Sequence, residues 1–374
     1  MSTGNAAVSC LKTNETCPSL RAFWNNAPAR VPSKTEMETK VNSSGFFLKT
    51  SAVLLLLSVA IVPSGNAKWK YYRTGADSDS QTTPRGGFAL MGGGGKQDPA
   101  FKFLCDRANG GDFLILRASG DDDYINSVDK EIKAMCPLNS ASTILFTDRE
   151  DSADPKIIPI IDQAESIFFA GGDQSNYVRF WQDTPVQDAL NRHIAAGKPI
   201  GGSSAGLAIL GQYVFSSMID TIYSKDALAN PYGNEVTLSR DFLQIPLLTH
   251  TITDTHFVKR DRLGRLMVFL ARILQDGWDT TVHAIAVDED AAVLVEPDGA
   301  SAVVGGRAYF MTASTPPTVC RYREPLTFGG IAVHRAQAGE SFDLKTWKGK
   351  GGDDYTLKVE KGVVTAPDSN HGLY

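Results

Sequence analysis

The sequence predicts an α/β protein whose main sheet is mostly parallel and covered by helices on both faces. From about Gly87 onward, short apolar runs alternate with amphipathic segments, and several of the apolar runs end in glycine. Parallel strands need a crossover between them, usually a helix, so this alternation is typical of a parallel sheet with two covered faces. In such sheets, ligands bind beyond the carboxyl ends of the strands.

The elements are assigned in chain order from the spacing of apolar residues. Short apolar runs predict strands at residues 87–95, 112–119, 142–147, 166–172 and 198–206. Helical spacing predicts helices at residues 100–108, 124–135, 155–164 and 185–197, the third of them interrupted by Pro159. In the last of these helices Val186, Leu190 and Ile194 share one face, and Gly197 provides the stop.

The C-terminal part differs from this α/β domain, which we place at residues 68–301. Residues 302–374 contain short apolar stretches separated by Gly and Pro. They predict a β-rich extension of the main sheet rather than an independent domain.

The N-terminal residues 1–67 form a third part. Residues 1–45 are rich in Ser, Thr, Asn and Pro and predict disorder. The uncharged run Ser51–Val62 is shorter than the roughly 20 apolar residues of a spanning helix. Lysines precede this run, and small residues follow it up to Ala67, which together predict a signal peptide. We therefore expect the protein to be exported, or tethered to a membrane if the signal is not cleaved.

Composition and charge exclude some classes of function. The net charge of −5 is small for 374 residues, and no tract interleaves basic with aromatic residues, so we expect no nucleic-acid partner. Beyond residue 67 only Cys105, Cys136 and Cys320 are present, too widely spaced for a metal-ligand pattern. One disulfide could form among them, but we expect buried free thiols and no metal site.

The glycine run Gly92–Gly95 matches no nucleotide-binding motif. It lacks the G-x-G-x-x-G spacing of dinucleotide sites, and Gln97 follows Lys96 where a P-loop would have Ser or Thr. We expect a tight turn there, with backbone amides lining an active site as the alternative.

Ser204 lies in the sequence Gly202-Ser-Ser-Ala-Gly206, which reads G-x-S-x-G and follows a predicted strand. A serine nucleophile gains from a strained strand-to-helix turn, and small neighbours allow close packing at that turn. The following helix would direct free N–H groups toward an oxyanion. Small residues also occur at such junctions for packing alone, so the motif leaves both interpretations open.

Among the six histidines, His256 has the surroundings that best suit a general base. It follows an apolar run, and Arg260, Arg262 and Arg265 cluster at the start of the helix after it. Arginines there oppose the helix dipole, which indicates a functional role, and guanidinium groups suit a substrate carboxylate. A solvated basic face is the ordinary alternative. The acid that would orient the histidine stays open among Asp220, Asp226 and Glu235.

Three motifs in order resemble one family: "FFAGGDQSNYV" (168–178), "GGSSAGLAIL" (201–210) and "TDTHFVKRDRLGRL" (253–266). Over roughly residues 86–300 the chain is similar to the cyanophycinase branch of serine peptidases, which includes the aspartyl dipeptidases. The resemblance implies a flavodoxin-like fold related to class I glutamine amidotransferases, with serine in place of cysteine. It also implies that hydrolysis needs no cofactor. The substrate it implies is a peptide that is aspartyl-rich and cyanophycin-like. A homodimer is compatible with it.

The resemblance assigns roles to individual positions. Ser204 matches the nucleophile, His256 the general base and Gln174 a residue that shapes the site. Asp254, Arg260, Arg262 and Arg265 match positions lining the substrate pocket.

Two departures from the family pattern matter. Cyanophycinases usually have glutamine directly before the histidine, where this chain has Thr255, and this puts cyanophycin itself in doubt as the substrate. The segment between Ser204 and His256 is also longer than in the simplest members. For the acid we favour Asp226, because "SKDALANPY" resembles a motif of exported relatives, with Asp220 next.

The resulting hypothesis is a serine peptidase that cleaves aspartyl or isoaspartyl bonds through an acyl-enzyme. The arginines would bind a substrate carboxylate, whereas an arginine in the substrate would call on Asp173 and Asp254. Two alternatives remain. One is an exported α/β-hydrolase-type esterase, whose fold also has the chain order Ser, Asp, His, and the other is an inactive carboxylate- or peptide-binding protein.

Overall fold

The computed structural model describes residues 69–374 except 96, 121–124 and 370–371, and describes no side chains for 125–128. The disordered segment and the signal peptide predicted at residues 1–67 lie outside the described residues. The described residues form one compact unit. Within its described part, no helix is both long enough and apolar enough to cross a membrane.

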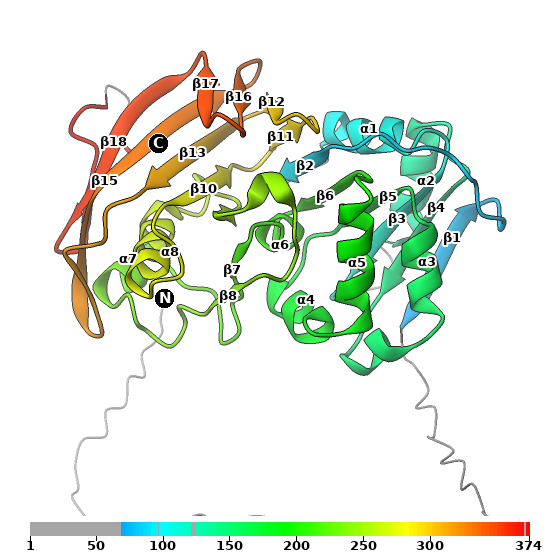
Figure 1. Cartoon of the computed structure of the whole chain (residues 1–374), viewed down its shortest axis with the longest axis horizontal. Coiled ribbons are helices and arrows are strands. Elements are labelled where there is room, and N and C mark those ends of the chain that lie inside the picture. Colours follow the sequence, from blue (N-terminus) through cyan, green and yellow to red (C-terminus); the bar gives the residue numbers. More distant parts are fainter. Residues whose placement is uncertain (1–68, 96, 121–124, 370–371) are drawn as a thin grey trace, which may run out of the picture. The chain divides into compact units, whose positions relative to one another are not determined.

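The described strands form two large sheets (Figure 1). The first sheet has the order β1 (Lys70–Gly75), β4 (Ser140–Leu145), β3 (Asp112–Arg117), β5 (Ser166–Phe169), β6 (Ile200–Ser203), β2 (Phe88–Met91), β11 (Ala291–Val295), β12 (Ala300–Gly305), β16 (Ser341–Asp343) and β17 (Lys348–Lys350). The second has the order β19 (Val363–Thr365), β18 (Asp353–Glu360), β15 (Glu324–Gln337), β13 (Arg307–Ala313), β10 (Val282–Val287), β9 (Thr251–Asp254), β7 (Tyr213–Phe215) and β8 (Leu238–Arg240), while β14 (Val319–Arg321) pairs with β15.

The helices connect and cover these strands. They are α1 (Asp98–Arg107), α2 (Ile125–Met135), α3 (Ile157–Gln163), α4 (Gln174–Trp181), α5 (Pro185–Ala195), α6 (Ala205–Ala208), α7 (Ser224–Ala229) and α8 (Leu263–Gln275), with 3₁₀ turns at Glu150–Ala153 and Pro246–Leu248. Pro159 does not interrupt α3, because it lies in the first helical turn, where its missing N–H has no partner to lose.

The predicted fold class is confirmed, since five strands of the first sheet are parallel and helices cover both faces. In β3, Leu114 and Leu116 pack with α3–α5, whereas Phe113 and Ile115 pack with α1 and α2. This alternation follows from the two-residue period of a strand. Strands β4-β3-β5-β6 follow the flavodoxin order 2-1-3-4, and β2 takes the next place although it is the first of the five parallel strands in the chain.

The C-terminal strands belong to both sheets, which corrects the expectation that they only extend the main one. β12, β16 and β17 extend the first sheet, and β13, β15, β18 and β19 complete the second, which packs against α7 and α8. The boundary expected between residues 301 and 302 falls within β12. A short apolar stretch does not encode which strand it will pair with, so the sequence pattern could not divide these strands.

The expectation of free thiols is wrong for two of the three cysteines. Cys105 of α1 and Cys136, just after α2, form a disulfide, while Cys320 is buried and free. Both helices pack on the same face of the first sheet and share one apolar cluster. Their packing brings together two cysteines that are 31 residues apart in sequence.

The loop between β10 and β11 carries the chain from the second sheet to the first. β10 runs parallel to β9, with Ala286 opposite Asp254, and β2 runs parallel to β6, with Met91 opposite Ser203. β11 in turn pairs with β2. The segments after β2, β6, β9 and β10 therefore meet where the two sheets are joined.

Candidate active site

Ser204 occupies a strained turn between β6 and α6. Its backbone has φ 53° and ψ −117°, and its amide donates to the Met91 carbonyl over 3.1 Å. A Cβ on Gly202 would lie 2.3 Å from the Gly206 carbonyl oxygen, and one on Gly206 would lie 2.1 Å from that of Phe169. The two glycines of the G-x-S-x-G motif are therefore required by close backbone packing, which holds the serine at the end of its strand.

His256 and Glu289 extend a chain of hydrogen bonds from this serine. Ser204 Oγ lies 2.7 Å from His256 Nε2, and His256 Nδ1 lies 2.7 Å from Glu289 Oε1. A carboxylate only accepts, so Nδ1 carries a proton and donates it to Glu289, and in the neutral ring Nε2 is free to accept from the serine hydroxyl. This arrangement is that of a nucleophile, a base and an acid that orients the base.

The environment of His256 favours its neutral form. Burial lowers the pKa of His256, and the positive charges of Arg260 and Arg262 lower it further, while the hydrogen bond to Glu289 opposes the shift. A base with a lowered pKa is unprotonated at neutral pH and can accept the serine proton.

Three consecutive acids after β10 hold three parts of the site. Asp288 Oδ1 accepts from the amides of Val258 and Lys259, in the turn after the histidine. Glu289 binds the histidine ring, and Asp290 Oδ1 accepts from the Gly95 amide. The glycine loop lies against the site as well: His256 N donates to the Gly92 carbonyl, and a Cβ on Gly93 would meet the imidazole at 2.3 Å.

The acid bonded to His256 is therefore Glu289, where the sequence analysis expected Asp226, with Asp220 or Glu235 as alternatives. Asp226 is exposed in the first turn of α7, and Asp220 is exposed in the loop before that helix. All three expected acids lie between the serine and the histidine in the sequence, whereas Glu289 lies beyond both. The sequence signal for Glu289 is the run of acids after the strand Val282–Val287, since that strand pairs in parallel with the strand before His256.

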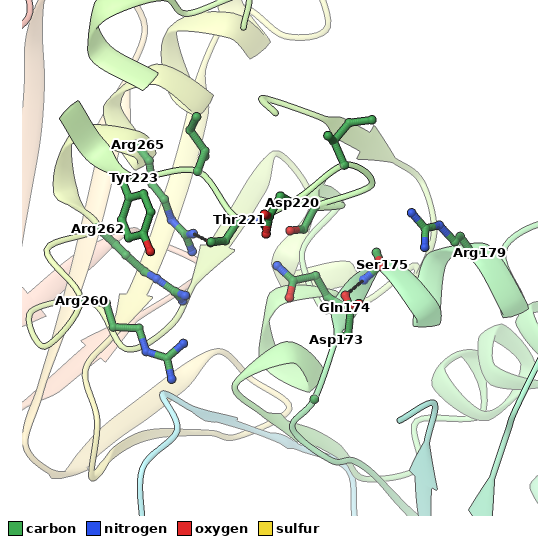
Figure 2. A pocket seen from close by; sticks show the side chains of 14 residues that line it. Asp173, Gln174, Ser175, Arg179, Asp220, Thr221, Tyr223, Arg260, Arg262 and Arg265 are labelled. Carbon is green, nitrogen blue, oxygen red and sulfur yellow. Dashed lines mark hydrogen bonds between the residues drawn. The ribbon is translucent and has the colours of Figure 1, made fainter. Parts of the chain in front are cut away.

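A cavity of about 390 Å³ lies beside this chain of hydrogen bonds, and four of the predicted substrate-binding residues line it, namely Gln174, Arg260, Arg262 and Arg265. Gly172 also lines it, and the neighbouring Gly171 packs against Ser204. Figure 2 shows the three arginines along one side of the cavity and Asp173, Gln174 and Arg179 along the other. Asp220 lies between the two sides.

Asp254 and Arg265 form a buried ion pair. Both are 2% exposed, Arg265 Nε donates to Asp254 Oδ2 over 2.9 Å, and Arg265 Nη2 donates to Oδ1. The Arg265 guanidinium also lies 5.0 Å from the Phe215 ring centroid. Because Asp254 binds Arg265 through both carboxylate oxygens, it serves this arginine rather than a substrate.

Thr255 holds Arg262. The Nη1 of Arg262 donates to the Thr255 carbonyl over 2.9 Å and to its hydroxyl over 2.8 Å, and lies 3.6 Å from Asp254 Oδ1. Burial lowers the pKa of Arg262 to about 10, with Asp254 opposing the shift. Thr255 is 2% exposed and does not line the cavity, so its side chain serves to position this arginine.

Arg260 is the accessible member of the three. Its side chain is 52% exposed, and its Nε lies 3.9 Å from Glu289 Oε1. Gln174 begins α4, and Asp173 caps that helix by accepting from the Ser175 amide. The cavity therefore has three arginines on one side, Asp173 and Arg179 on the other, and the carboxylate of Asp220 between them.

A second group of carboxylates lies at the opposite edge of the first sheet, where β3 and β5 begin. Asp79, Asp112 and Glu165 each place an oxygen within 4.8 Å of the others, a spacing that a metal ion could use. However, Asp112 Oδ1 already accepts from Arg73, Asn139 and Ser140, and the Asp112 amide donates to Glu165. These bonds account for Asp112 and Glu165 as structural residues.

Comparison with known proteins assigns the chain to a family. The model of peptidase family S51 matches residues 100–303, more than half of the chain. The chain belongs to peptidase family S51. It is therefore a serine peptidase, and the resemblance drawn from the three motifs is confirmed.

Several relatives of this S51 peptidase carry a more specific name. The cyanophycinases of Synechococcus elongatus and Thermosynechococcus vestitus are each 26% identical over 252 residues, which cover 65% of this chain and 73% of theirs. The cyanophycinase of Trichormus variabilis is 25% identical over 207 residues, covering 53% and 63%.

Two solved structures are more distant. A peptidase from an acI-B1 Actinobacterium is 18% identical with a TM-score of 0.46, covering 70% of this chain and 98% of that one. A putative peptidase E from Listeria monocytogenes is 14% identical with a TM-score of 0.35, covering 59% and 98%.

Proposed function

We propose that this S51 peptidase hydrolyses aspartyl or isoaspartyl peptide bonds through a Ser204–His256–Glu289 triad. The observation that carries the proposal is the unbroken chain of 2.7 Å contacts from serine to glutamate, beside a cavity with an arginine wall. An aspartyl residue linked through its β-carbonyl keeps a free α-carboxylate, which two carbons separate from the scissile carbonyl. Arg260 and Arg262 lie where such a carboxylate can be bound.

The reaction proceeds in two halves. Ser204 Oγ attacks the scissile carbonyl carbon while its proton passes to His256 Nε2, and Glu289 stabilises the imidazolium that forms. The tetrahedral intermediate collapses as the leaving amine takes the proton from Nε2, which leaves an ester on Ser204. Water, deprotonated by the same nitrogen, then attacks the ester carbonyl. The second tetrahedral intermediate releases the acid as Ser204 Oγ takes the proton back from Nε2.

The intermediate's oxyanion needs donors that are already in place. Ala205 is the first residue of α6, and the first N–H groups of a helix have no partner within it. This amide follows the nucleophile directly, so it can donate to an oxygen bound at Ser204. Gly171, whose missing Cβ would lie 3.4 Å from Ser204 Cβ, leaves room for that oxygen.

The opposite wall suits a basic residue after the scissile bond. Asp173 lines the cavity across from the three arginines, and Asp220 lies between the two sides (Figure 2). The relatives' name, cyanophycinase, supports a substrate in which aspartate is joined to arginine, because that unit has a carboxylate for one wall and a guanidinium for the other.

A small panel of dipeptides tests this proposal. We expect β-Asp-Arg to be cleaved and Ser204→Ala to abolish cleavage. The same dipeptide with its aspartyl α-carboxylate amidated should show a KM about tenfold higher or more, because the arginines lose their charged partner. Equal KM values for the two compounds, or cleavage of a simple ester alone, would contradict aspartyl recognition.

We also propose that the protein is exported. The Cys105–Cys136 disulfide supports this, because structural disulfides persist mainly in oxidising compartments. Cell fractionation of the full chain tests it: recovery with the cytosolic fraction and with both thiols reduced would contradict export.

A further inference from the structure

The segment that follows His256 is a tight turn that needs support. Arg260 N donates to the His256 carbonyl, Arg262 N donates to the Phe257 carbonyl, and Asp261 has a positive φ of 49°. The turn carries both arginines proposed to bind the substrate carboxylate. Its geometry therefore decides where their guanidinium groups lie.

Tyr374, which is far from this turn in the sequence, binds it. Its hydroxyl donates to Asp261 Oδ1 over 2.6 Å and accepts from the Leu263 amide over 3.2 Å. One phenol group therefore joins the strained residue of the turn to the first residue of α8. Both bonds connect residues more than one hundred positions apart in sequence.

The aromatic ring and backbone of Tyr374 are fixed as well. The ring packs edge-on against Phe257 at 5.6 Å and against Tyr309 at 6.3 Å. Arg335 Nη1 donates to the Tyr374 carbonyl over 2.7 Å, and the Tyr355 hydroxyl donates to the Leu373 carbonyl over 3.1 Å. Strands β13, β15 and β18 thus supply the rigid support that a positioning residue requires.

From these contacts we infer that Tyr374 is a positioning residue for the peptidase site, resting on the proposed function for what Arg260 and Arg262 bind. It acts through the 256–262 turn and touches neither substrate nor the triad. His256 itself is also held by Ser204, Glu289 and the Gly92 carbonyl. Loss of the Tyr374 hydroxyl should therefore displace the arginines more than the histidine.

The test compares Tyr374→Phe with Tyr322→Phe, a matched control at a tyrosine that is 57% exposed. For Tyr374→Phe we expect faster amide hydrogen exchange confined to residues 257–263. We also expect a KM for β-Asp-Arg raised about tenfold, with kcat changed less than about twofold. The control should match the wild type, and both variants should keep the wild-type midpoint of urea unfolding.

The other possible results of the exchange and kinetic measurements decide between the inference and the proposed substrate. Unchanged exchange at 257–263 would overturn the inference whatever the activity is, because this measurement needs no substrate. Faster exchange with unchanged KM and kcat would also overturn it, leaving Tyr374 a structural contact. If the wild type cleaves no aspartyl dipeptide, the proposed substrate fails instead, and the exchange measurement still decides whether Tyr374 holds the turn.

Discussion

At the residue scale, the three arginines beside the active site use their charges differently. Arg265 is buried and paired with Asp254, so its charge is neutralised within the protein. Arg262 is held by Thr255 and presents the rest of its guanidinium to the cavity. Arg260 is half exposed and lies near Glu289, so it can act on both the substrate and the triad.

This position of Arg260 makes a prediction about pH. Its positive charge disfavours protonation of His256, so removing the charge raises the pKa of His256. In Arg260→Gln a larger fraction of the histidine is therefore protonated at a given acidic pH, and the acidic limb of the kcat/KM profile should move to higher pH. Profiles measured between pH 4 and 8, a range set by the ordinary histidine pKa of about 6.5, would show the shift.

Arg179→Gln is the matched control for this shift. Arg179 also lines the cavity, but it is not among the charges that act on His256. We expect the acidic limb of the kcat/KM profile of Arg179→Gln to coincide with that of the wild type. A limb that moves equally in both variants, or in neither, would show that Arg260 does not tune the histidine.

At the element scale, the disulfide joins α1 to α2 on a face of the first sheet that lies away from Ser204. Closing a loop between residues 31 apart restricts the unfolded chain, and such a loop contributes about 3–4 kcal/mol to the free energy of unfolding. The double variant Cys105→Ser, Cys136→Ser should lose stability of this order and keep wild-type kcat/KM. Urea unfolding with and without reductant measures the loss, and a stability equal to the wild type would contradict it.

The same elements show how far the sequence could predict this structure. Each of the five short apolar runs predicted as strands before residue 207 contains a strand, because the period and length of such a run are local properties of the chain. Ser204 and His256 were found from local motifs in the same way. The place of Glu289 depends on β10 lying parallel to β9 and then turning into the other sheet, which no local pattern encodes. The disulfide likewise depends on the packing of two helices, not on cysteine spacing.

At the scale of the whole molecule, the site lies where the two sheets are joined. Ser204 follows a strand of the first sheet and His256 a strand of the second, and Glu289 lies in the loop by which the chain passes from one to the other. The neighbouring acids Asp288 and Asp290 hold the histidine turn and the glycine loop. The crossing loop thus sets the geometry between nucleophile and base.

Kinetic comparison of Glu289→Gln with Asp226→Asn on β-Asp-Arg tests this account most directly. An amide at position 289 no longer stabilises the imidazolium or fixes its tautomer, so kcat/KM should fall on the order of a thousandfold while the urea midpoint changes little. Asp226, exposed on α7, should tolerate its change with wild-type kinetics. Full activity in Glu289→Gln, or a collapse of activity in Asp226→Asn, would contradict the triad described above.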